Sequence, residues 1–149
     1  MRKKNDWTAR VLLLVPRVVG SGKNDQTVAV FDKKKQEPWW WNFPGGRKKV
    51  GEIPAQTASR ELKEETGLTV YPKDLLLIQS LRSTKGFPLF LFIGYLNDFS
   101  GIMEYGDEGE EVKIFNIRDL FKMDTFYWEK KGYLDDLKKS LELLNIKIG

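Results

Sequence analysis

The sequence predicts an α/β fold in which a mixed sheet is covered on its faces by helices. Three observations lead to this prediction. Short runs rich in Val, Leu and aromatic residues alternate with turns that contain Gly and Pro, which is typical of strands. Two other segments carry apolar residues at helical spacing. Strands interspersed with helices bury both kinds of apolar surface by packing in layers.

The chain has 149 residues, which is long enough to bury a proper core, and we expect a single domain over residues 1–149. No apolar run approaches the ~18 residues that span a membrane. The apolar run at 11–15 is short and is flanked by Arg10 and Pro16, unlike a secretory signal. We therefore expect a cytoplasmic protein without membrane contact. The oligomeric state stays open between monomer and homodimer.

The first half of the chain is expected to supply three strands. Residues 8–19 are rich in Val and Leu, residues 20–25 form a turn cluster, and residues 27–31 are the hairpin partner. Residues 39–43 form a short aromatic strand that ends at the Pro-Gly-Gly sequence 44–46. Two glycines after a strand allow a close approach of the backbone.

A helix is predicted over residues 54–66. Pro54 suits the first helical position and Gly67 suits the end of the helix. At about 100° per residue, three small or apolar side chains fall on one stripe that can pack against a sheet. These are Ala55, Ala58 and Leu62.

The second half is expected to add three strands and a helix. Residues 75–82 and 89–96 are strands joined by a turn at 84–88, and residues 111–117 form a further strand. The last element is an amphipathic helix over 132–146, with leucines at helical spacing.

The most informative part of the chain is residues 46–68, with the spacing G-x5-E-x7-R-E-L-x-E-E-x-G-L. Glu61, Glu64 and Glu65 sit at i, i+3 and i+4, so they share one helical face. Three like charges this close raise one another's pKa values, and a bound hard cation removes that penalty. Ligands that are all oxygen favour Mg²⁺, with Mn²⁺ as the alternative, over zinc or copper.

Taken alone, Glu-x-x-Glu-Glu also fits a solvated helix face. The complete spacing is far more specific, because seven fixed identities match by chance at only about 10⁻⁸ per starting position. The seven are Gly46, Glu52, Arg60, Glu61, Glu64, Glu65 and Gly67.

Composition points the same way. The chain has no cysteine and no histidine. It therefore has no disulfide, no thiol nucleophile, no Ser-His-Asp chemistry and no zinc site of the Cys or His type. Any catalysis has to use carboxylates, Lys, Arg, Tyr, hydroxyl groups or a metal.

The net charge of +4 is unevenly distributed. Basic runs lie at 2–4, 33–35 and 47–49, and acidic residues gather at 61–65 and 104–111. A basic rim around an acidic, metal-loaded centre would attract an anionic ligand. Solubility charge on loops is the alternative, particularly for the first two runs.

The spacing of residues 46–68 resembles the signature box of the Nudix hydrolases, with no position missing. The sequence Trp41-x-Phe43-Pro44-Gly45-Gly46 is similar to the common approach to that box. The resemblance implies an α/β/α sandwich. It also implies a hydrolase that uses divalent metal to cleave a nucleoside diphosphate linked to another group.

By this resemblance, Glu64 and Glu65 are metal ligands, and Glu61 is either a further ligand or the base that activates water. The backbone carbonyl of Gly46 often joins the metal shell. Bound cations would neutralise the phosphate oxygens and lower the pKa of water. The expected reaction is hydrolytic substitution at phosphorus.

Two further roles follow from the resemblance. Arg60 and Glu52 are expected to pair and to hold the helix and its preceding loop in position. Many family members also use an acidic residue well past the box. Glu108 is favoured here, followed by Glu111 and Glu104, although a solvated acidic turn is the alternative.

Residues outside the box are the main indication of the substrate. Strand alternation would put Trp39 on one side of the sheet and Trp40 on the other, where either could stack on a nucleobase. Trp41 is interpreted as scaffold. Arg47 and Arg82 are candidates for contacts with phosphate or base. Three more aromatic residues are candidates for a lid: Phe87, Tyr127 and Trp128.

The size of the chain favours a nucleoside triphosphate or a modified nucleotide as substrate. The proline that often follows the box in ADP-ribose enzymes is not evident, since Pro88 is too far on. Dinucleoside polyphosphates or the 5′ end of RNA are the alternatives among enzymes, although nucleic acid is not the favoured partner. A Nudix module that senses nucleotides without cleaving them is the alternative from another class.

Overall fold

The computed structural model describes residues 6–16, 25–31, 38–83, 85–96, 106–107 and 109–147. The described part contains a seven-stranded sheet. Its strands are β1 (Thr8–Val15), β2 (Gln26–Phe31), β3 (Trp41–Asn42), β4 (Gly45–Arg47), β5 (Leu76–Arg82), β6 (Pro88–Tyr95) and β7 (Glu111–Asn116). The helices are α1 (Pro54–Thr66), the 3₁₀ turn η1 (Pro72–Asp74), α2 (Ile117–Phe121), α3 (Tyr127–Lys130) and α4 (Leu134–Leu143).

The sheet is mixed, as predicted. Its strands follow the order β3-β2-β1-β6-β5, while β4 pairs with β1 and β7 pairs with β2. β1 runs parallel to β6 and antiparallel to both β2 and β4. The hairpin expected after the first strand is present, with Leu14 opposite Thr27. β1 therefore forms the centre of the sheet, and its first half pairs with the glycines of β4.

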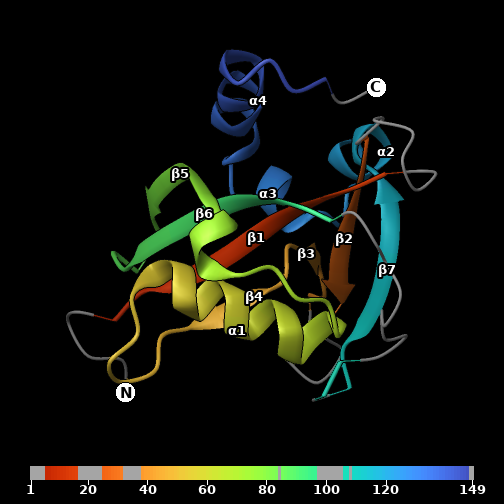
Figure 1. Cartoon of the computed structure of the whole chain (residues 1–149). Helices are drawn as coiled ribbons and strands as arrows, with labels where there is room; N and C mark the ends of the chain where they lie inside the picture. The colour runs from red at the N-terminus through yellow and green to blue at the C-terminus, as the bar shows by residue number, and fades with distance from the viewer. Residues whose placement is uncertain are drawn as a thin grey trace.

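Two apolar cores lie on the two faces of the sheet. Alternate residues of β1 serve each core, because successive side chains of a strand point to opposite faces. Val11 and Leu13 pack with Leu62 of α1, whereas Leu12 and Leu14 pack in the core that α2, α3 and α4 cover. Figure 1 shows α1 across one face of the sheet and the other helices beyond it. The predicted layered α/β/α arrangement is confirmed.

The aromatic strand is shorter than predicted. We expected a strand over 39–43, but β3 spans only Trp41–Asn42 and a separate strand, β4, starts at Gly45. The backbone N–H of Phe43 donates to the side chain of Asn42 at 2.8 Å instead of to a neighbouring strand. Pro44 has no N–H to donate. The chain therefore stops pairing with β2 after β3 and begins to pair with β1 in β4.

The C-terminal region has more helices than the sequence predicted. α2 starts at Ile117 and is capped by Asn116, whose Oδ1 accepts from the N–H groups of Arg118 and Asp119, which is a typical N-cap. α3 is a single turn, and α4 covers the middle of the helix predicted over 132–146. Short helices have too few residues to show a period, so they escaped the sequence pattern.

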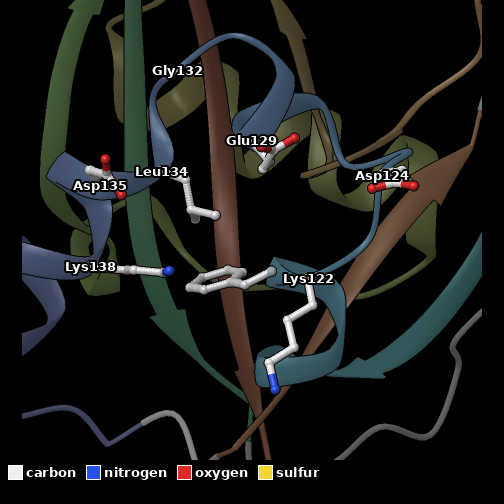
Figure 2. A pocket seen from close by; sticks show the side chains of 8 residues that line it. Lys122, Asp124, Glu129, Gly132, Leu134, Asp135 and Lys138 are labelled. Carbon is white, nitrogen blue, oxygen red and sulfur yellow. The ribbon is translucent and has the colours of Figure 1, made fainter.

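A cavity of about 390 Å³ lies between α2, α3 and the start of α4. Figure 2 shows that its charged side chains are spread around the cavity, with Lys138 on one side and Lys122 and Asp124 on the other. None of the lining residues belongs to the Glu-rich helix or its loop. This cavity is therefore not a candidate for the chemistry that the sequence predicts. Within the described residues, no helix is both long and apolar enough to cross a membrane.

Candidate active site

α1 carries the predicted carboxylates and is well delimited. Pro54 occupies its first turn, and the N–H of Ile53 donates to the side chain of Gln56 at 3.0 Å. Gly67 ends the helix with φ 80°, a left-handed conformation that glycine adopts without strain. The buried face of α1 contains Ala58 and Leu62, so packing against the sheet fixes the rotation of the helix and the position of the glutamates.

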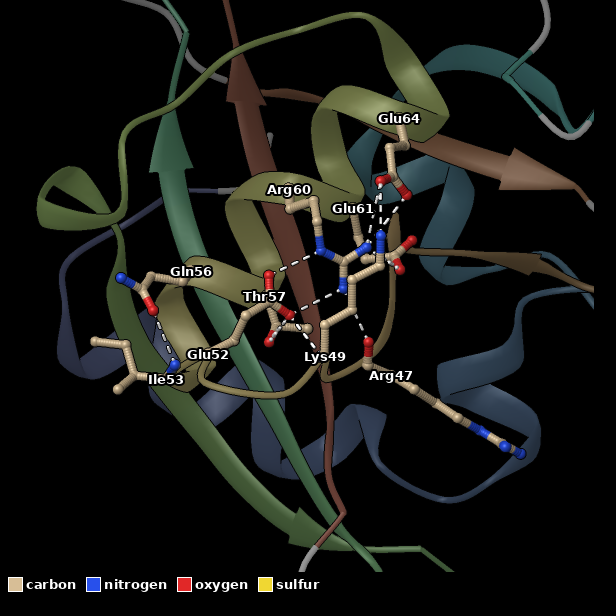
Figure 3. Close-up of polar contacts among 9 residues, drawn as sticks. All are labelled: Arg47, Lys49, Glu52, Ile53, Gln56, Thr57, Arg60, Glu61 and Glu64. Atoms are coloured by element: carbon tan, nitrogen blue, oxygen red, sulfur yellow. Dashed lines mark hydrogen bonds and ion pairs between the residues drawn. The ribbon is translucent and has the colours of Figure 1, made fainter. Parts of the chain in front are cut away.

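Arg60 is the centre of a polar network between α1 and the preceding loop (Figure 3). Its Nε donates to Glu52 Oε2 at 2.8 Å, and its Nη2 donates to Glu52 Oε1 at 3.0 Å. Nη2 also donates to the carbonyl of Arg47 at 3.0 Å. The guanidinium thus holds one carboxylate in a two-pronged contact and fixes the loop at the same time.

This ion pair changes the titration of both partners. The side-chain hydrogen bond from Arg60 holds the pKa of Glu52 at about 2. The pKa of Arg60 is raised, chiefly by its hydrogen bond to Glu52. Thr57 also donates to Glu52 Oε1 at 3.0 Å. The expected pair between Arg60 and Glu52 is therefore present and is ionised across the working range of a protein.

Glu61 faces the glycines of β4. A Cβ atom added to Gly46 would lie 2.5 Å from Cδ of Glu61, so only glycine permits this approach. Arg60 Nη1 donates to Glu61 Oε1 at 2.9 Å. Burial nevertheless dominates, and it raises the pKa of Glu61 above its ordinary value. This carboxylate is held between the backbone of a strand and an arginine.

Glu65 is the innermost of the three. The N–H of Gly45 donates to its Oε1 at 2.6 Å. Burial raises the pKa of Glu65 to about 8, while the charge of Arg10 and the bond from Gly45 act in the opposite direction. The carboxyl of Glu65 is thus protonated near neutral pH when no cation is bound.

Arg10 is a residue that the sequence analysis missed. Its Nη1 donates to the carbonyl of Phe43 at 2.7 Å, and its charge acts on both Glu61 and Glu65. It is the one charged residue of β1, in which the residues from Val11 onward are all apolar. That isolated charge was a usable signal, because a cation inside an apolar strand needs a specific partner.

Glu64 is the most accessible of the three carboxylates, with 40% of its side chain exposed. Arg60 Nη1 lies 3.2 Å from Glu64 Oε2, and Lys49 Nζ lies 3.9 Å from Glu64 Oε1. The N–H of Asp107 donates to the backbone carbonyl of Glu64 at 3.0 Å. Glu64 therefore lies at the open side of the group, where a distant loop meets the helix.

The structure does not test the favoured candidate for the distal acidic residue. Glu108 and Glu104 lie outside the described residues, and Glu111 belongs to β7, opposite Phe31. The structure instead brings Glu110 to the site, since only 3% of it is exposed and its charge raises the pKa of Glu65. Gly106 makes room for it, because a Cβ there would lie 2.5 Å from Glu110 Oε1.

Strand alternation could have identified Glu110. Val112 and Ile114 of β7 pack in the core beneath α1. Because residues two apart share a face, Glu110 points to the same side as these two, whereas Glu111 points to the opposite side. The apolar partners on the strand were visible in the sequence, but which face α1 covers was not.

The candidate substrate residues are dispersed. Arg47 is exposed at the end of β4, and its side chain points away from the carboxylates in Figure 3. Arg82 Nη1 donates to the carbonyl of Gly86 within the exposed β5–β6 turn. Trp39 and Trp40 are half-buried, and Lys130 Nζ lies 5.8 Å from the ring centre of Trp40.

Two other aromatic residues have structural roles. Trp41 stacks on Phe31 and meets Phe115 edge-on, which agrees with its interpretation as scaffold. Trp128 is completely buried and its indole N–H donates to Gln79 at 2.9 Å. The prediction that Trp128 belongs to a lid was therefore wrong, because this side chain is part of the core.

The donor chemistry of the site fits a hard divalent cation. Glu61, Glu64 and Glu65 supply only oxygen ligands, and burial disfavours the ionised form of two of them. Among the described residues, no group of three or more Asp, Glu, His or Cys side chains is arranged so that it could hold a metal ion. In Figure 3, Arg60 contacts both Glu61 and Glu64.

Comparison with known proteins places this geometry in a family. The model of the NUDIX domain matches residues 13–137. An ADP-ribose pyrophosphatase of Methanocaldococcus jannaschii is 32% identical over 140 residues, which cover 89% of this chain and 81% of that protein.

Solved structures share the fold. An Ap4A hydrolase of C. elegans, in a binary complex, matches with a TM-score of 0.68 and 21% identity, over 93% of this chain and 98% of the other. A mutT/nudix family protein of Listeria innocua matches with a TM-score of 0.66 and 21% identity, over 97% and 96% of the two chains. At this identity the likeness supports the arrangement of sheet and helices.

Proposed function

The chain belongs to the NUDIX domain family and is a hydrolase of phosphoanhydride bonds; from this premise we propose that it cleaves the pyrophosphate of a nucleoside diphosphate derivative with a divalent cation. The observation that carries the proposal is the group formed by Glu61, Glu64 and Glu65 at the glycines of β4. The inner two are partly buried, with 18% of the Glu61 side chain exposed, and the outer one is more accessible, with 40% of the Glu64 side chain exposed.

Glu64 and Glu65 would hold the cation together with the carbonyl of Gly46, and Glu61 would be a further ligand or the base. Mg²⁺ is the expected ion and Mn²⁺ the alternative, because both prefer oxygen ligands. When bound, the ion supplies charge neutralisation for the phosphate oxygens and a lowered pKa for water. The ion also favours the ionised form of Glu65, whose pKa burial otherwise raises to about 8.

Each remaining residue of the group has a distinct role. Glu61 is either a ligand or the group that accepts a proton from the attacking water, and burial raises its pKa, which makes it a stronger base than an exposed carboxylate. Glu52 and Arg60 position the helix against its loop without touching the substrate. Glu110 is a further candidate for the distal role that the sequence predicts for Glu108, because it is buried and its charge acts on Glu65.

Two substrates deserve the first tests. ADP-ribose is supported by the relative from M. jannaschii, whose match covers 89% of this chain. A nucleoside triphosphate is supported by chain size and by the tryptophans before the box, but Trp41 packs inside the scaffold and Trp40 is half-buried. We therefore place ADP-ribose first and nucleoside triphosphates second.

Product analysis tests the proposal directly. Purified protein with Mg²⁺ is incubated with ADP-ribose, nucleoside triphosphates, dinucleoside polyphosphates and RNA carrying a 5′ triphosphate. We expect a nucleoside monophosphate from the preferred small substrate, and ¹⁸O-water identifies the attacked phosphorus. The absence of any product from the whole panel would contradict the proposal and favour a module that senses nucleotides.

Substitutions test the metal assignment. Glu64→Gln and Glu65→Gln should each abolish turnover while the circular dichroism spectrum stays close to that of the unmodified chain. Glu142→Gln on the exposed side of α4 is the control and should keep full activity. Turnover retained by both site variants is incompatible with the assignment.

Two substitutions at neighbouring positions test which acidic residue takes the distal role. Glu110→Gln should lower kcat strongly, whereas Glu111→Gln, on the neighbouring position and the opposite face of β7, should keep it. The reverse result would favour Glu111, the second candidate that the sequence predicts. If both variants keep kcat at saturating Mg²⁺, neither residue is the distal ligand.

A further inference from the structure

Two cations contact Glu64, and they are held in very different ways. Arg60 is fixed by its two-pronged contact with Glu52 and by the carbonyl of Arg47. Lys49 makes a single contact to Glu64, at 3.9 Å, and 66% of its side chain is exposed. The guanidinium is therefore a fixed part of the site, while the ammonium is free to turn away.

The backbone of Lys49 is nevertheless anchored at the site. Its N–H donates to Glu52 Oε1 at 2.7 Å, and its carbonyl accepts from the N–H of Glu52 at 3.1 Å. Figure 3 shows its side chain running beside Arg60 toward Glu64. A fixed backbone with a flexible four-carbon stem puts one mobile charge within reach of the accessible carboxylate.

We propose that Lys49 is a displaceable counter-ion of Glu64. It neutralises this carboxylate while the site has no divalent cation, and it then turns to bind a phosphate oxygen of the incoming nucleotide. The inference rests on the proposed function, because it takes Glu64 as a metal ligand. It adds a residue that links metal binding to substrate binding.

Electrostatics gives the reason for the exchange. A divalent cation at Glu64 repels an ammonium that lies 3.9 Å from the same carboxylate. Since an exposed ion pair contributes little, Lys49 leaves at small cost. The phosphate groups of the substrate then supply the negative charge nearest to the Lys49 ammonium. The ammonium binds a phosphate oxygen without requiring a fixed geometry.

The neighbouring basic residues do not share this position. The ammonium of Lys48 lies 4.5 Å from the ring centre of Trp7. The side chain of Arg47 points away from the carboxylates in Figure 3. Lys48 is thus a control of equal charge in the same loop, one residue away from Lys49.

The test compares Lys49→Gln with Lys48→Gln in the full chain. Calorimetry and electron paramagnetic resonance measure the affinity for Mn²⁺ in the absence of nucleotide. We expect Lys49→Gln to bind Mn²⁺ about two- to fivefold more tightly than the unmodified chain. With saturating Mg²⁺, the same variant should raise KM for ADP-ribose about two- to fivefold and keep kcat within about twofold. Lys48→Gln should leave both quantities unchanged.

Unchanged Mn²⁺ affinity in Lys49→Gln, or an equal change in Lys48→Gln, would overturn the counter-ion role. An unchanged KM would overturn the phosphate contact. Glu64→Gln separates this inference from the proposed function, since it should lose Mn²⁺ affinity whatever Lys49 does. If Glu64→Gln binds Mn²⁺ as the unmodified chain does, the metal assignment itself fails.

Discussion

Arg60 donates to four different acceptor groups. The planar shape of its guanidinium explains why this position is occupied by an arginine. One guanidinium binds both oxygens of Glu52, the carbonyl of Arg47 and the carboxylates of Glu61 and Glu64. A planar group with five N–H donors can serve acceptors in several directions, which an ammonium on a flexible stem cannot do.

Arg60→Lys should therefore lower the free energy of unfolding although it keeps the charge. We expect a loss of about 1–3 kcal/mol, because the partly buried Glu52 loses its two-pronged partner. Urea denaturation at pH 7 measures the change. Arg118→Lys, on the exposed side of α2, is the matched control and should change the value by less than about 0.5 kcal/mol. Equal stability of both variants would show that Arg60 is not a brace.

The pKa of Glu65 gives a pH dependence with a definite sign. Its carboxyl titrates at about 8 in the fold and at the ordinary 4.5 when exposed. Between these values the folded chain holds a proton that the unfolded chain has lost, so stability falls as pH rises. The slope is at most about 1.4 kcal/mol per pH unit.

In a chelating buffer, the free energy of unfolding should thus fall from pH 5 to pH 8, and Glu65→Gln should flatten the decline. Glu61 accounts for a remaining slope of the same sign, since burial also raises its pKa. Urea denaturation at several pH values measures both. An identical decline in the variant would show that Glu65 is not the titrating group.

At the scale of elements, the close approach of β4 to α1 defines the site. The Gly45–Gly46 pair brings a strand backbone against two carboxylates of the helix, and the bond from the Gly45 N–H to Glu65 crosses that contact. The sequence predicted a close backbone approach at these glycines. It did not predict which strand would receive them, and the structure pairs them with β1.

Gly46→Ala should therefore reduce activity more than stability. The new Cβ would lie 2.5 Å from Cδ of Glu61, so the carboxylate has to move. A displacement of this kind is expected to lower kcat/KM by about 10²-fold. Hydrolysis assays and thermal melting measure the two effects.

Gly86→Ala is the control, and it should affect stability but not activity. No atom lies within 4 Å of its added Cβ, but its φ is +83°, so the substitution should cost about 1 kcal/mol of stability and leave kcat/KM unchanged. If Gly46→Ala retains full activity, the position of Glu61 does not depend on this glycine.

At the scale of the whole molecule, a buried hydrogen-bond chain connects the C-terminal helices to the sheet. Trp128 Nε1 donates to Gln79 Oε1 at 2.9 Å, and Gln79 Nε2 donates to the carbonyl of Tyr133 at 2.9 Å. These three residues come from β5, α3 and the start of α4. The chain lies on the face of the sheet opposite α1 and is therefore separate from the carboxylates.

Gln79→Leu should destabilise the protein without changing catalysis. It leaves the N–H of the fully buried Trp128 without an acceptor, which costs about 1–3 kcal/mol. Kinetic parameters should stay unchanged, and urea denaturation measures the loss. Ser80→Ala, at the next position of β5 and exposed, should leave stability unchanged. A drop in kcat for Gln79→Leu would show that the two faces of the sheet are coupled.

The sequence by itself determined the local features of this protein. The spacing of Glu52, Arg60 and the three box glutamates follows from the helical period, and local periodicity survives in any environment that permits a helix. Most strands were likewise visible as apolar runs, and their predicted bounds differ from the observed ones mainly at the ends.

Only the tertiary structure decided which distant residues join the site. The charges of Glu110 and Arg10 act on Glu65. Arg10 is close because β1 pairs with β4, and Glu110 is close because β7 and α1 share one core. Trp128 proved to be core for the same kind of reason. Strand pairing and register depend on contacts between residues far apart in the chain, and no local period encodes them.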